Sequence, residues 1–126
     1  MGRTVTVEVP GRPVSLNSER TRHWAQRAEQ MAQVRRDARI VTFEALGPYT
    51  PRPVFEMVTV DVYPWARDRR YRQDVANCYP SFKAALDGAV DAGLITSDDD
   101  RYLSSVTFHP HQFGRDALVL VFHEVG

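Results

Sequence analysis

Cysteine, lysine and long apolar runs are scarce in this chain of 126 residues. Cys78 is its one cysteine, which excludes an internal disulfide and a thiolate zinc cluster within one chain, so we expect a structural role for it. No segment approaches the roughly 20 apolar residues that a membrane-spanning helix needs, and the first residues lack the apolar core of a signal peptide. We therefore expect a soluble, cytoplasmic protein.

An excess of charge of either sign is also missing, but the net charge of zero is a sum over two unlike halves. Residues 1–72 contain 13 arginines and 8 acidic residues, a net charge of +5. Residues 73–126 contain 3 basic and 8 acidic residues, a net charge of −5. Positive charge suited to phosphates is therefore concentrated upstream, which favours contact with a nucleic acid over a merely solvated surface.

The composition and the hydropathy pattern predict one small α+β domain. A hydrophobic content of 43% in 126 residues suffices for one core and not for two, so we expect a single domain spanning residues 1–126. Alternating apolar and polar residues predict strands at 4–9 and 54–63, and residues 102–109 and 117–124 are expected to supply two closing strands. Helical spacing predicts helices at 21–46 and from Pro80 to Gly93, since proline is favoured in a first turn and glycine after a last one. These elements suggest a small mixed sheet of about four strands with two main helices.

Each predicted helix has an apolar stripe. In the first helix the stripe consists of Trp24, Ala28, Met31, Ala38, Val41 and Ala45. In the second helix it consists of Phe82, Ala85, Leu86 and Ala89. Polar residues, Lys83 and Asp87 among them, occupy the other side of the second helix.

Acidic residues, one asparagine and the chain's only lysine gather around the second helix. They are Asp74 and Asn77 before the helix, Lys83 and Asp87 one turn apart on it, and Asp98, Asp99 and Asp100 after Gly93. Carboxylate oxygens suit a hard divalent ion such as Mg²⁺, and such an ion beside a lysine suits hydrolysis of a phosphodiester. Taken singly, Lys83 and Asp87 are also typical of a helix-surface ion pair, and an Asp-rich run is typical of a polar turn.

In this order the residues resemble the RusA family of Holliday junction resolvases. The signature of that family is Asp-x-Asp-Asn, then a Lys with an Asp four residues later, then a Gly and an Asp-Asp pair. Its positions fall on Asp74, Asn77, Lys83, Asp87, Gly93 and the pair Asp98-Asp99. The second acidic position falls on Ala76, and extra residues lie before Lys83 and before the Asp pair. Residues 13–24 (PVSLNSERTRHW) resemble the early Pro and Asn loop of the family, so the likeness covers nearly the whole chain.

The resemblance implies a Mg²⁺-dependent, structure-selective endodeoxyribonuclease that cuts branched DNA such as Holliday junctions. It also implies a RusA-like fold, a homodimer, Mn²⁺ as a substitute ion, and a phage-type variant encoded by a phage or a chromosome. The catalytic residues would be Asp74, Lys83 and Asp99, and the metal ligands Asp74, Asp98, Asp99 and Asp100. Asn77 and Asp87 would support the ligands without binding the ion. We expect Asp100, or else Asp87, to compensate for the carboxylate missing at Ala76.

Arginine side chains are the predicted DNA contacts. They are Arg67, Arg69, Arg70 and Arg72 in the segment WARDRRYRQ, together with Asn17 and Arg20 upstream. Guanidinium groups bind phosphates, and the aromatic rings of Trp65 and Tyr71 could stack on unpaired bases. A solvated hairpin tip with its rings packed beneath it explains the same pattern. His109 and His111 could bind a metal, but decoration of a turn is the simpler interpretation.

Two other functions are compatible with the sequence. The first is a catalytically silent DNA-binding or phage accessory protein with the same fold, in which Ala76 marks a lost active site. The second is a small α+β protein of unrelated function. Carboxylate-dependent binding of Mg²⁺ or Mn²⁺ separates the enzyme from both.

Overall fold

The structure is a computed structural model that describes residues 2–14, 24–71 and 74–126. Three of the predicted DNA contacts, Asn17, Arg20 and Arg72, lie outside the described residues, as does the start of the first predicted helix.

The described residues form a mixed sheet and two α-helices in a small single domain, which confirms the predicted α+β class. The elements are β1 (Thr4–Pro10), α2 (Trp24–Leu46), β2 (Val58–Ala66), the short 3₁₀ helices η1 (Arg69–Tyr71) and η2 (Val75–Cys78), α3 (Tyr79–Asp91), β3 (Leu103–Phe108), β4 (Gln112–Phe113) and β5 (Ala117–Glu124). The strand order is β1-β5-β2-β3, and β4 also pairs with β2. Strand β5 is antiparallel to β1 and β2, whereas β3 and β4 are parallel to β2. The sheet thus has five strands, one of only two residues, where about four were expected.

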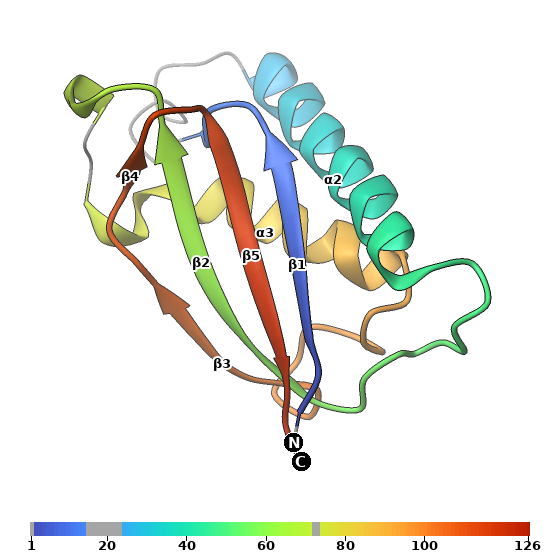
Figure 1. Cartoon of the computed structure of the whole chain (residues 1–126). Helices are drawn as coiled ribbons and strands as arrows, with labels where there is room; N and C mark the ends of the chain where they lie inside the picture. The colour runs from blue at the N-terminus through green and yellow to red at the C-terminus, as the bar shows by residue number, and fades with distance from the viewer. Residues whose placement is uncertain (1, 15–23, 72–73) are drawn as a thin grey trace.

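One face of the sheet packs against both helices. Val58, Val60 and Val62 of β2 belong to the same buried core as residues of α2 and α3, and the residues that alternate with them, such as Asp61 and Tyr63, point to the other face. This alternation is the period of two that a half-buried strand requires. Among the described residues no helix covers the second face, as Figure 1 shows.

The predicted buried face of α2 was partly wrong. The residues of α2 that pack on the core are Val34, Ala38, Val41 and Leu46. Trp24, in contrast, is 69% exposed, and Ala28 and Ala45 are exposed as well. Figure 1 shows the first turns of α2, which include Trp24 and Ala28, beyond the end of β1, so helical spacing of apolar residues does not predict burial there. Ala45 lies in the last turn of the helix and is exposed as well.

The predicted stripe of α3 is confirmed: Phe82, Ala85, Leu86 and Ala89 are all buried. Gly93 follows the helix with φ of +92°, which is the left-handed conformation predicted for it. Within the helix, Gly88 lies where α3 crosses α2. A Cβ atom there would lie 2.8 Å from Cβ of Ala38, so the absence of a side chain lets the two helices approach closely.

Two predicted boundaries needed correction. Strand β2 begins at Val58 rather than at residue 54, because the backbone N–H groups of Val54 and Phe55 donate to the carbonyls of Gly93 and Leu94. Strand β2 also continues to Ala66, so Trp65 belongs to a strand and not to the loop. Among the described helices none is long and apolar enough to cross a membrane.

Candidate active site around Lys83

Lys83 joins the two halves of the acidic motif. Its Nζ lies 2.6 Å from Oδ1 of Asp87, one turn further along α3, and 2.6 Å from Oδ2 of Asp98, in the loop between α3 and β3. The inward stripe of α3 fixes the rotation of the helix and leaves Lys83 on its partly exposed side. The structure therefore brings together three of the predicted site residues.

The ammonium group of Lys83 is a stable positive charge. Partial burial lowers the pKa of Lys83, but hydrogen bonds to Asp87 and Asp98 outweigh the burial, so the pKa is raised overall. At neutral pH the side chain is protonated, and it can stabilise an anion but cannot accept a proton. With 42% of the side chain exposed, the site is open to solvent and thus to a ligand.

Asp99 is held by an arginine that the sequence interpretation missed. The guanidinium of Arg101 donates to both carboxylate oxygens of Asp99, from Nε at 3.1 Å and from Nη2 at 2.9 Å. The hydroxyl of Ser97 donates to the same carboxylate at 2.7 Å. The bonds from Arg101, followed by the bond from Ser97, hold the pKa of Asp99 well below its usual range. Asp99 is therefore ionised at any pH at which the protein would act.

The residues before α3 differ in exposure. Asp74 and Ala76 are exposed at the start of η2, and the carbonyl of Asp74 accepts the backbone N–H of Asn77 at 2.9 Å. The side chain of Asn77 is buried, with 6% exposure. Cys78 is buried as well, and burial raises the pKa of its thiol to about 11, which agrees with the structural role predicted for it.

The carboxylates do not form a metal site in this arrangement. Among the described residues no three His, Cys, Asp or Glu side chains are close enough together to hold an ion. Lys83 and Arg101 already neutralise Asp98 and Asp99. Asp100 is exposed and has no cationic partner among the described residues. The ligand set of Asp74, Asp98, Asp99 and Asp100 therefore stays a prediction.

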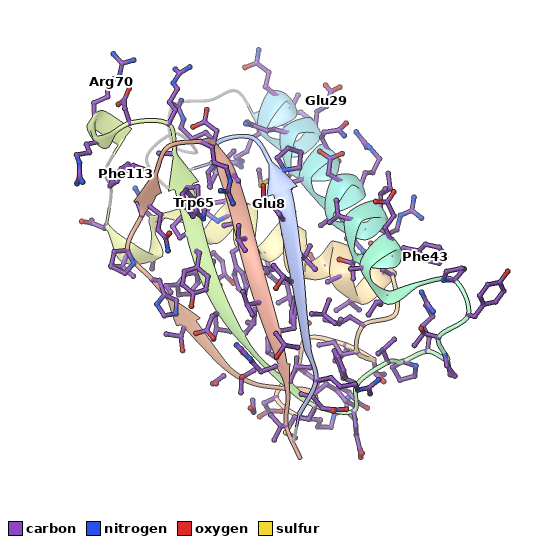
Figure 2. All side chains as sticks on the ribbon, viewed as in Figure 1. Glu8, Glu29, Phe43, Trp65, Arg70 and Phe113 are labelled. Atoms are coloured by element: carbon purple, nitrogen blue, oxygen red, sulfur yellow. The ribbon has the colours of Figure 1, made fainter. Side chains whose placement is uncertain are left out.

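The arginines of the predicted DNA-binding loop gather at one end of the sheet. Arg67, Arg69 and Arg70 follow the end of β2, and Figure 2 shows Arg70 beyond the ends of the strands. Trp65 was predicted to stack on bases from the same loop. It lies instead in β2, where the guanidinium of Arg115 covers its ring.

A second polar cluster lies on the open face of the sheet. Asp61 of β2 accepts hydrogen bonds from Nε2 of His109 and Nε2 of His123, both at 2.8 Å. The bond from His109 is the main cause of the lowered pKa of Asp61. The sequence interpretation did not single out Asp61 or His123, which the register of β2 with β5 brings together. This cluster explains His109 better than a turn decoration does.

No protein-family model matches the sequence, and no curated protein matches it. The likeness to RusA resolvases therefore depends on the residues quoted above and on what their geometry supports.

Proposed function

We propose that the protein is a Mg²⁺-dependent endodeoxyribonuclease that cuts branched DNA and acts as a homodimer. The observation that carries this proposal is the position of Lys83. The chain's only lysine contacts Asp98, the first acid of the Asp run, so a positive charge lies where three successive acidic residues begin. A compact ammonium of this kind can approach one phosphate oxygen closely.

The proposal places a condition on the carboxylates. Lys83 and Arg101 compete with an ion for Asp98 and Asp99, since each carboxylate is hydrogen-bonded to a cation in this structure, so release of these bonds would favour binding of an ion. Lys83 would then be free to contact the scissile phosphate. A divalent ion, once bound, supplies Lewis-acid activation of phosphate and water.

Cleavage of a synthetic four-way junction with and without Mg²⁺ tests the proposal. We expect Asp74→Asn and Asp99→Asn each to abolish cutting while junction binding in EDTA is unchanged or tighter, because each change removes a charge that repels phosphates. Asp37→Asn is the matched control, since Asp37 lies on α2 and its carboxylate has Gln33 as its only partner among the described residues. Cutting by the wild type in EDTA, or full activity of both site variants, would contradict the proposal.

A catalytically silent DNA-binding protein is the second candidate. Two observations favour it: a methyl group stands at Ala76, and Lys83 and Arg101 neutralise two of the predicted ligands. Isothermal titration separates the two functions. Heat of Mg²⁺ or Mn²⁺ binding that disappears in Asp74→Asn supports the enzyme, whereas junction binding without any metal heat supports the silent protein.

The homodimer follows from the resemblance alone. Paired cuts on opposed strands of a junction need two active sites, which a dimer provides. Light scattering at the concentration used for cleavage measures the mass directly, and a monomeric mass together with paired cuts would argue against this arrangement.

A further inference from the structure

The turn between β4 and β5 packs against the arginine-rich loop that follows β2. Gly114 N–H donates to the carbonyl of Ala66 at 3.0 Å, and Arg67 N–H donates to Oδ1 of Asp116 at 2.9 Å. In the same region β4 pairs in parallel with the last residues of β2. Residues 67–70 and 113–116 are therefore held together at one end of the sheet. Trp65 points to the open face there, and Phe113, which pairs with Ala66, points to the opposite face.

Two guanidinium groups at this end of the sheet rest on aromatic rings, one on each of these two residues. Cζ of Arg115 lies 4.1 Å from the ring centroid of Trp65, and Cζ of Arg69 lies 5.1 Å from that of Phe113. Figure 2 shows Trp65 and Phe113 at the same end of the sheet as Arg70. A ring beneath a guanidinium attracts its charge and restricts its rotamers, while the N–H groups in the guanidinium plane stay available to an anion.

The carboxylates nearby hold Arg115, and Arg70 next to Arg69, only weakly. Arg115 pairs with Glu8 at 2.7 Å, with side chains that are 47% and 49% exposed, and Arg70 pairs with Asp68 at 3.1 Å. Exposed pairs of this kind contribute little, so a phosphate can compete with them. Arg69 has no carboxylate partner among the described residues, and its full charge is available.

We propose that Arg115 and Arg69 form a two-point clamp on the phosphodiester backbone of DNA, and that Trp65 and Phe113 support the guanidiniums and do not stack on bases. The inference rests on the proposed function only in that the partner is DNA. It differs from the sequence interpretation in two ways: it adds Arg115 to the interface, and it gives Trp65 a positioning role. Contacts to phosphate carry no sequence information, so the clamp binds DNA irrespective of base identity.

The test is fluorescence anisotropy of a labelled four-way junction in EDTA over a series of salt concentrations. We expect Arg115→Ala and Arg69→Ala each to reduce the slope of log K against log salt by about 0.9, the value for one phosphate contact. Arg115→Lys keeps the charge and is expected to keep most of the slope. Arg3→Ala is the matched control, because Arg3 also lies over a ring, that of Phe55, and pairs with Glu124, but at the opposite end of the sheet.

A double-mutant comparison tests the role of the ring. If Trp65 only supports Arg115, then Trp65→Leu weakens binding no more than Arg115→Ala, and the double variant binds like Arg115→Ala alone. Additive losses would mean that Trp65 contacts DNA independently, which would overturn the supporting role. Thermal unfolding of each variant checks that the fold persists, and Trp65→Phe provides a milder change of the same ring.

The outcomes separate this inference from the proposed function. If the wild type does not bind the junction, both fail. If the wild type binds and Arg115→Ala has the same affinity and slope, only the clamp is overturned. Slope changes in Arg115→Ala and Arg69→Ala but not in Arg3→Ala support it.

Discussion

Gly88→Ala offers a direct test of the helix crossing that supports the candidate site. The new Cβ would lie 2.8 Å from Cβ of Ala38, 2.9 Å from the backbone nitrogen of Arg39 and closer still to the carbonyl oxygen of Arg35. All three are backbone or Cβ atoms of α2, so no flexible side-chain end can move aside. The helices must therefore separate. Their separation also lengthens the bidentate bond between Arg35 of α2 and Asp91 of α3, whose N–O distances are 2.6 and 2.9 Å.

Two opposing effects set the change in the free energy of unfolding that Gly88→Ala causes. Replacing glycine by alanine inside a helix stabilises it by about 1 kcal/mol, whereas overpacking a close contact costs about 1–3 kcal/mol. Because the contacts at Gly88 involve backbone, we expect the larger cost and a net loss of about 2 kcal/mol. For a domain of this size that corresponds to a fall in Tm of roughly 8 °C.

Urea unfolding followed by circular dichroism measures this loss. The control is Ala32→Gly at an exposed position of α2, which should lose about 1 kcal/mol through helix propensity alone. If Gly88→Ala were as stable as the wild type or more stable, propensity would have prevailed, and the helices would cross less closely than the structure has them.

Three further predictions concern charge. Arg101→Ala should raise the affinity of the protein for Mg²⁺ a few-fold in isothermal titration, because it removes the cation that competes for Asp99; equal or weaker binding would contradict this. Hydrogen bonds from two histidines lower the pKa of Asp61, and the stability from that shift is lost as the carboxylate is protonated. In thermal melts, lowering the pH below 3.8, the usual pKa of an aspartate, should therefore destabilise the wild type more than it destabilises the Asp61→Asn variant. Asp100→Ala should weaken Mg²⁺ binding, and adding Ala76→Asp should restore much of it.

The sequence predicted the fold where burial is periodic on one face. The stripe of α3 and the strand at residues 4–9 have clear periods, and the structure confirms them. The strand at residues 117–124 is confirmed as well, although its first four residues are all buried and do not alternate. The prediction was wrong at Trp24, where an apolar residue continues the helical spacing past the end of the core. It was also wrong at Val54, where backbone bonds to a distant loop, which no local pattern encodes, replace strand pairing.

The site was predictable to the extent that local spacing defines it. Lys83 and Asp87 are one helical turn apart, so their contact follows from the sequence. The pairing of Asp99 with Arg101 could have been proposed from their separation of two residues, but the run of three aspartates favoured an interpretation as metal ligands. Arg115 and the Asp61 cluster depend on the register between strands, which composition and spacing do not determine.

Asp100 and Ala76 bear on one question, which is how many carboxylates remain to bind an ion. Lys83 neutralises Asp98 and Arg101 neutralises Asp99, whereas Asp100 has no cationic partner among the described residues. A hard ion that lacks a carboxylate at Ala76 would therefore find its most available oxygens at Asp100, in a loop whose reach can adjust. For this reason the loss in Asp100→Ala should be reversed by Ala76→Asp, which places a carboxylate two residues from Asp74 on the same exposed turn. If Asp100→Ala binds Mg²⁺ like the wild type and Ala76→Asp does not tighten binding, Asp100 does not compensate, and Asp87 becomes the remaining candidate.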